Sequence, residues 1–230
     1  MAGHRGAVVR SAGLARPASA KSSPAKDTDR ETRERLLDVA ARLFAERGLH
    51  NVTVRDICRD AGANVAAINY HFGGKSGLYE EVLRVAIRIM QSTNDEILRV
   101  GENKPPAAQL EAAIRIFLVR VVTTPNKWIH QLMLQEVSSP TPAFDMVIKE
   151  VLKPRMLYVR NAIAGIMSCS PDDPRVAMCV MSVQSQLIAL LNSPLGSRVE
   201  APKLTPDRVE TLARHIACFS IAGVRAIAAT

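Results

Sequence analysis

The chain has 230 residues, of which 47% are hydrophobic and 4% aromatic, enough to bury the core of one large domain or two small ones. Ala, Val, Ile, Leu and Met dominate and few segments alternate with period two, so we predict an all-α fold. The net charge of +8 is compatible with a nucleic-acid partner. It does not locate a site, because residues 27–80 carry eight basic and nine acidic side chains.

Cysteine and histidine usage gives no sign of metal or redox chemistry. Cys58, Cys169, Cys179 and Cys218 form no C-x-x-C pair, and the five histidines lack metal-ligand spacing. Buried free thiols in a reducing cytoplasm are the favoured interpretation, with a redox-sensing pair as the alternative. No nucleophile–base pair or carboxylate pair is found, so the sequence predicts no enzyme, no cofactor and no bound metal.

The N-terminal residues 1–27 are predicted to be a flexible basic tail, because they are rich in Ala, Ser, Gly, Pro and Arg without apolar periodicity. Their apolar patches are too short for a secretory signal. A solvated tail is favoured over an arm that touches DNA. The first helix is predicted to begin with a capping box of Thr28 and Glu31 and to end at Gly48.

Two short helices joined by a tight turn are predicted between Thr53 and Phe72. Thr53 caps the first, with Asp56 three residues later, and Gly62 supplies the left-handed residue that a sharp turn needs. Asn64 caps the second helix, residues 65–72, whose Ile68 and Phe72 point to the core. This is the helix-turn-helix pattern, whose second helix enters the DNA major groove.

The outward side of that second helix is the predicted DNA-binding surface. Base contacts are assigned to Asn69 and Tyr70, with Ala66 and Ala67 small enough for close approach to base methyl groups. The full set of candidate DNA-binding residues is Thr53, Arg55, Asn64, Ala66, Ala67, Asn69, Tyr70, His71 and Lys75. Among these, Thr53, Arg55, Tyr70, His71 and Lys75 are the candidates for phosphate contacts.

The segments RERLLDVAARLFAERG and TVRDICRDAGANVAAINYHFGGKSGLYEEVL resemble the DNA-binding domain of TetR-family transcriptional regulators over residues 31–83. The position that is commonly Tyr in the recognition helix is Asn69 here, so the operator sequence is not carried over. The segment LMLQEVSSPTPAFDMVIKEVLKP resembles the C-terminal region of the CecR-like subgroup. The resemblance implies a repressor that binds double-stranded operator DNA and responds to a small-molecule effector, with efflux or transport genes as targets.

Six more helices are predicted beyond the turn. They span residues 75–100, 107–122, 126–137, 143–167 with a kink at Pro154, 174–192 and 205–228. The domain division is therefore a tail at 1–27, a three-helix DNA-binding domain at 28–78 and a larger helical ligand-binding and dimerisation domain at 79–230. The last two helices are apolar nearly all round, which predicts a homodimer with a four-helix interface rather than a membrane span.

A ligand cavity is predicted between the helices of the larger domain. Its candidate lining residues are Met90, Phe117, Trp128, Met133, Phe144, Met156, Tyr158 and Met167. Met side chains and few buried charges would suit an apolar, drug-like effector. The helix from Lys75 to Val100, about 38 Å long, is predicted to act as the lever between this cavity and the DNA. The alternative is a constitutive helix-turn-helix protein with no ligand.

Overall fold

The computed structural model describes residues 24–123, 126–191 and 205–230, and in these residues the ordered elements are all helical. The end that is predicted to bind DNA, called the DNA-binding end below, holds α1 (Pro24–Arg47), α2 (Val54–Ala61), α3 (Val65–Phe72) and the start of α4 (Lys75–Gly101). The remaining elements are α5 (Pro106–Thr123), α6 (Lys127–Ser138), α7 (Phe144–Val147), the π-helical turn η1 (Ile148–Leu152), α8 (Lys153–Met167), α9 (Pro174–Leu191) and α10 (Pro206–Ala228). The predicted all-α architecture is confirmed.

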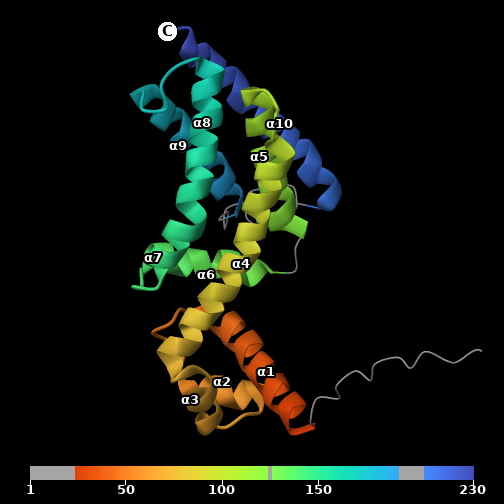
Figure 1. Ribbon diagram of the computed structural model, residues 1–230, viewed down its shortest axis with the longest axis vertical. Coiled ribbons are helices and arrows are strands. Elements are labelled where there is room, and N and C mark those ends of the chain that lie inside the picture. The colour runs from red at the N-terminus through yellow and green to blue at the C-terminus, as the bar shows by residue number, and fades with distance from the viewer. Residues whose placement is uncertain (1–23, 124–125, 192–204) are drawn as a thin grey trace, which may run out of the picture.

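The elements form an elongated molecule with two ends (Figure 1). Helices α1 to α3 gather at one end, and α5, α8, α9 and α10 form a bundle at the other. The long α4 runs from the first group into the second, while α6 and α7 cross the molecule between them. Buried apolar side chains form two clusters that succeed each other along α4, with Ile87 in the first and Ile97 in the second.

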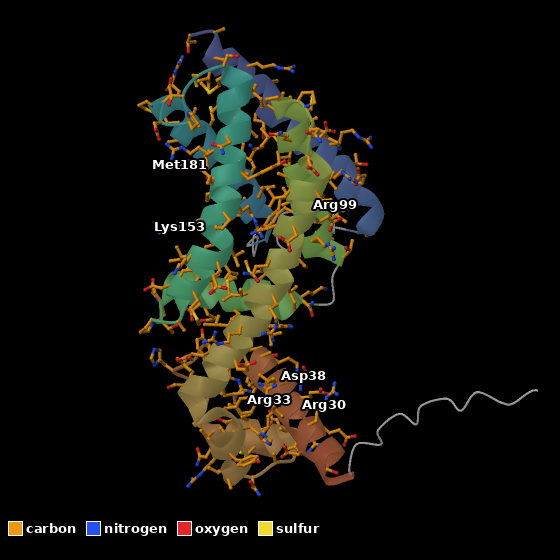
Figure 2. All side chains as sticks on the ribbon, in the orientation of Figure 1. Arg30, Arg33, Asp38, Arg99, Lys153 and Met181 are labelled. Atoms are coloured by element: carbon orange, nitrogen blue, oxygen red, sulfur yellow. The ribbon has the colours of Figure 1, made fainter. Side chains whose placement is uncertain are left out.

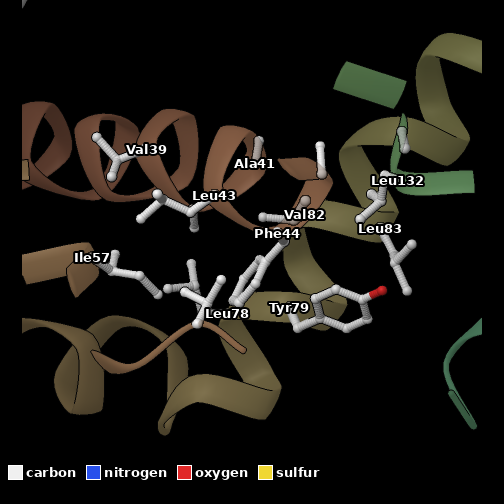
Figure 3. Packing of buried hydrophobic residues seen from close by; sticks show 14 of the residues in the cluster. Val39, Ala41, Leu43, Phe44, Ile57, Leu78, Tyr79, Val82, Leu83 and Leu132 are labelled. Carbon is white, nitrogen blue, oxygen red and sulfur yellow. The ribbon is translucent and has the colours of Figure 1, made fainter. Parts of the chain in front are cut away.

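The first cluster is built around aromatic packing between α1 and α4. The ring of Phe44, with none of its surface exposed, packs edge-on against Tyr79 at a centroid distance of 5.0 Å (Figure 3). Ile129 and Leu132 of α6 belong to the same cluster. The core of the DNA-binding end therefore continues into α6 rather than ending at residue 78, because α6 packs directly on α1.

The second cluster joins the long helices of the upper bundle. Helix α5 packs against α4, α8 and α10, and α9 packs against α8 and α10. Leu110, Leu118 and Ile163 are completely buried between these helices. A hydrogen bond of 3.3 Å from Gln186 of α9 to the buried hydroxyl of Ser220 ties α9 to α10.

Most predicted helices match to within one residue at each end, and two features differ more substantially. Helix α1 begins at Pro24, so Thr28 lies inside the helix, where its carbonyl accepts a hydrogen bond from the Thr32 hydroxyl, and it is not the cap. The predicted tail up to residue 23 lies outside the described residues. The helix predicted at 143–167 has no simple kink at Pro154 but a π-helical turn before it. Because proline has no N–H to donate, a local change of hydrogen-bond register before it is physically reasonable.

Candidate DNA-binding surface and ligand cavity

Capping interactions fix the turn between α2 and α3. The Thr53 hydroxyl accepts a hydrogen bond of 3.2 Å from the Asp56 amide, and the Asp56 carboxylate accepts from the Thr53 amide at 3.1 Å. The predicted cap at Thr53, with Asp56 three residues later, is confirmed and forms a full capping box. Gly62 ends α2 with φ of 60°, and the Asn64 side chain caps α3 by accepting from the Ala67 amide at 2.8 Å. These local bonds hold α3 at a fixed angle to α2.

Helix α3 presents a small, polar and exposed surface. Ile68 is fully buried against the core, whereas Tyr70 is 79% exposed. Ala66 and Asn69 are also exposed, and Ala67 is half-buried. A helix anchored by one buried side chain and flanked by exposed small and polar residues has the shape that the major groove admits.

The structure places His71 differently from the prediction that it faces outward. Its side chain is only 8% exposed and its Nε2 lies 3.4 Å from the Asp29 carboxylate on α1. Its ring also contacts Phe72, which lies under the guanidinium of Arg33 at 5.2 Å. Arg33 is among the α1 residues labelled in Figure 2. His71 therefore holds α3 against α1, because position 71 of this short helix turns toward α1 rather than away from the protein.

The three predicted phosphate contacts outside α3 have different surroundings. The hydroxyl of Thr53 donates to Asp56 at 2.6 Å and its amide donates to the same carboxylate, so both of its donors are engaged in the cap. These hydrogen bonds hold the pKa of Asp56 below its usual value, so the cap acceptor is ionised at neutral pH. Arg55 is exposed. The Lys75 ammonium donates to the Val52 carbonyl at 2.7 Å, and an ammonium group has two further protons to offer.

An apolar cavity of about 250 Å³ lies between the two hydrophobic clusters. It is lined by side chains from α4, α5, α6, α8 and α9, with Phe144 and Leu152 from the α7–η1 segment. Five of the eight predicted lining residues meet here: Met90, Phe117, Met133, Phe144 and Met156. The structure thus brings together residues that are up to 66 positions apart in the sequence.

The other three predicted lining residues lie elsewhere. Trp128 is on the opposite side of α6, where it packs on the first cluster and borders a hollow with Leu37 of α1. Met167 is buried in the second cluster. The Tyr158 hydroxyl is buried near Gly101 without a hydrogen-bond partner among the described residues. The presence of an aromatic or Met side chain did not distinguish a cavity-lining residue from a core residue, because the core and the cavity wall are both apolar.

Sequence reasoning missed the charged residue of the cavity, Arg155. The side chain lines the cavity, donates from Nε to the Asn94 amide oxygen at 2.8 Å and lies over the Phe117 ring at 5.0 Å. Burial lowers the pKa of Arg155 to about 10. One sequence signal could have found it: Arg155 stands four residues from both Val151 and Val159, which are buried, and so lies on the inner face of its helix.

A second polar group, His130 of α6, also lines the cavity. Burial, and secondarily the positive charge of Arg155, lower the pKa of His130. The imidazole is therefore neutral at physiological pH. Its neighbours at helical spacing, Met133 and Leu134, line the same cavity, so His130 is on the cavity face of α6.

The buried Glu136 joins α6 to α4. Its carboxylate, 1% exposed, accepts hydrogen bonds from the Tyr79 hydroxyl and from the Thr141 amide at 2.9 Å. Burial and this carboxylate raise the pKa of Tyr79 well above its usual value, so the phenol stays protonated and remains a donor. Helix α6 thus lines the cavity with one face and is tied to the DNA-binding end by the other.

The two C-terminal helices leave large apolar side chains exposed in the single chain. These are Met178, Met181, Ile188, Phe219 and Ile227, with exposures from 37% to 69%. Met181 is labelled at the edge of the bundle in Figure 2. Among the described helices, one stretch, Arg208–Ala228 of α10, is long and apolar enough for a membrane span by length and composition alone, and 28% of its most apolar window is buried. A helix that packs in a protein interface can have the same length and the same apolar composition.

Comparisons with known proteins agree with this architecture. Residues 36–82 match the family described as bacterial regulatory proteins, tetR family, and residues 106–224, more than half of the chain, match the C-terminal domain of the HTH-type transcriptional dual regulator CecR. CecR of Shigella flexneri is 27% identical over 177 residues, which cover 69% of this chain and 75% of that protein. The HTH-type transcriptional repressor KstR2 of Rhodococcus jostii is 40% identical over 93 residues, covering 40% of this chain and 45% of that one.

A crystal structure of a TetR-family transcriptional regulator from Bordetella parapertussis has the same fold. Its TM-score is 0.65 at 17% identity, with 82% of this chain and 93% of that chain covered. The helix-turn-helix end, the helical C-terminal domain and both family matches lead to one conclusion. The chain belongs to the TetR family of bacterial transcriptional regulators, which are not enzymes, and its C-terminal domain is of the CecR type.

Proposed function

We propose that this regulator is a homodimeric repressor that is released from its operator when a small molecule occupies the cavity between the two hydrophobic clusters. The observation that carries the proposal is the double role of α6. Met133 and Leu134 of this helix line the cavity, while Ile129 and Leu132 belong to the core of the DNA-binding end. A ligand that displaces α6 acts directly on the packing that positions α1.

Recognition of DNA is assigned to the exposed residues of α3. Asn69 can form a bidentate contact with adenine, and Ala66 with Ala67 allows close approach to a thymine methyl group. Arg55, Tyr70 and Lys75 are the proposed phosphate contacts. Thr53 and Asn64 support the surface as caps. Thr53 and His71 are no longer proposed as phosphate contacts, because their side chains interact with Asp56 and Asp29 within the protein.

Dimerisation is assigned to the exposed apolar side chains of α9 and α10. Phe219, which is 64% exposed, and Met181, which is 69% exposed, are the proposed centre of the interface. Leu187 and Ile216 are poorer probes of the interface, because they are 6% and 5% exposed and support the core of the protomer. A two-fold dimer would present two copies of α3 to a near-palindromic operator.

The path from cavity to DNA runs through two helices. Helix α4 begins beside α3 and reaches the cavity at Met90 and Ile97, as the sequence predicted for a lever. Helix α6 is a second path, which the sequence did not predict, because its packing on α1 is a tertiary contact. A ligand that shifts either helix changes the orientation of α3, and a coupling of about 1–3 kcal/mol is sufficient for regulation.

The experiment begins with selection of duplexes from a randomised DNA pool by the full-length protein. We expect a near-palindromic consensus, and footprinting should show two protected half-sites on one face of the duplex. A panel of small molecules is then tested for release of the selected DNA, measured by fluorescence anisotropy. If cavity-binding compounds leave operator affinity unchanged, the protein is a constitutive DNA-binding protein, which is the alternative function.

The genes under control are proposed to be efflux or transport genes beside the regulator's own gene, and the site of action is the cytoplasm, where the chromosomal operator lies. The apolar cavity supports this only in a general way, since compounds that fit it are the kind that transporters export. Binding of the selected consensus to the adjacent intergenic DNA tests the assignment. A consensus that is absent from that region would contradict it.

A further inference from the structure

Arg155 is a half-buried charge for which the described residues provide no ion pair. Its guanidinium projects into a cavity whose other walls are almost entirely apolar. Moving a charged group out of water is costly unless another charge or several hydrogen bonds compensate it. A structural role would therefore predict a carboxylate close to Arg155.

No described carboxylate forms an ion pair with Arg155. Its contacts are one hydrogen bond from Nε to Asn94 and the face of the Phe117 ring. A guanidinium carries five N–H donors, so most of its hydrogen-bonding capacity is unused in these contacts. The nearby arginine of α5, Arg120, shows the contrast, because it is bonded to Glu96 at 2.6 Å.

Arg155 lines two neighbouring hollows. The larger one, the apolar cavity, extends to Val183 and Leu187 of α9. A smaller hollow of about 50 Å³, bordered by Thr93 and Asn126, shares Arg155, His130 and Phe117 with it. The charged group therefore stands where an apolar space meets a more polar one, which is the arrangement that an amphipathic ligand requires.

We propose that the effector is a small amphipathic anion, such as a medium-chain carboxylate, whose acidic group pairs with Arg155 while its apolar tail fills the space toward α9. This rests on the proposed function and replaces the expectation of a purely apolar effector. The planar fork of arginine matches a carboxylate in two-point hydrogen bonding. The cavity of about 250 Å³ lies just below the range of drug-sized pockets, so the acid is small.

The test compares three probes with the same eight-carbon tail: octanoate, 1-octanol and octylamine. Binding to the full-length protein is measured by calorimetry. Since hydrogen bonds to charged groups are stronger than those between neutral groups, octanoate should bind about ten- to a hundredfold more tightly than 1-octanol, and octylamine more weakly than both. In Arg155→Met the preference for octanoate over 1-octanol should disappear. Arg115→Met, which removes a surface arginine paired with Glu210, should retain it.

The outcomes separate this inference from the proposed function. Equal affinity for octanoate and 1-octanol in the wild type, or no binding of any probe, overturns the inference, and neither result depends on the folding of a variant. A preference for octanoate that survives in Arg155→Met also overturns it. Octanoate that binds through Arg155 but does not release operator DNA supports the inference and contradicts the proposed ligand-controlled function.

Discussion

The polar groups of the DNA-binding end and those of the cavity differ in how they are hydrogen-bonded. At the DNA-binding end, Thr53, Asp56 and Asn64 satisfy one another or the nearby backbone within three residues of sequence. In the cavity, Arg155 is held by Asn94, which is 61 positions away, and keeps unused donors. The first arrangement completes a rigid surface before any partner arrives, whereas the second leaves N–H donors available to the proposed ligand. The candidate DNA-binding surface is therefore preformed, whereas the cavity is the proposed place of ligand recognition.

The largest expected effect is loss of the rigid end through Phe44→Ala. Phe44 is fully buried against Tyr79, so its truncation should lower the free energy of unfolding by about 3–5 kcal/mol. Chemical denaturation measures this. Tyr70→Ala is the matched control, because Tyr70 is 79% exposed and its removal should change stability by no more than about 0.5 kcal/mol. Similar losses in both variants would contradict the assignment of these two aromatic side chains.

Dimer formation should respond strongly to Phe219→Arg. A charge in the centre of an apolar interface should cost about 2 kcal/mol or more, which weakens association by roughly thirtyfold. Sedimentation velocity at micromolar concentration should show a shift from dimer to monomer. Leu98→Arg on α4 is the control, because Leu98 is 53% exposed but lies outside α9 and α10. A wild-type monomer under these conditions would rule out the interface.

The exposed surface of α3 should separate into base-reading and anchoring residues. Asn69→Ala should cost about 1–3 kcal/mol on the selected operator and relax specificity, because the lost contact is to a base edge. Lys75→Ala should weaken binding to all duplexes alike and reduce the slope of log affinity against log salt by about one. Anisotropy titrations on operator and random DNA measure both. If Asn69→Ala lost the same affinity for operator and for random DNA, the assignment of Asn69 as a base-reading residue would be contradicted.

The smallest effect is a pH dependence at the cavity end. Burial lowers the pKa of His130, so the unfolded chain takes up a proton near the usual value of about 6.5 while the folded protein does so only at lower pH. Stability should therefore fall as the pH drops from 7.5 to 5.5, and it should fall less in His130→Gln. Denaturation at both pH values measures the difference, with His50→Gln at an exposed turn position as the control. An unchanged pH dependence in His130→Gln would contradict the burial argument.

The features that the sequence predicted are local in the chain, and those that it missed depend on long-range packing. The caps at Thr53 and Asn64 and the glycine turn at Gly62 were predictable because each depends on residues within one or two helical turns. The packing of α6 on α1 and the inward position of Arg155 were not predicted, because both depend on how distant helices meet. For Arg155 the buried neighbours Val151 and Val159 gave a usable periodic signal, but a charged residue on an apolar face was not weighed as a ligand contact.

The measurement that tests the coupling of the two ends most directly is calorimetric titration of octanoate into the free dimer and into its complex with the selected operator. If the cavity and α3 are linked through α4 and α6, operator DNA should weaken octanoate binding by the same factor, about 5- to 150-fold, by which octanoate weakens operator binding. Equal affinity of octanoate for the free and the DNA-bound protein would contradict the account, however tightly the compound binds.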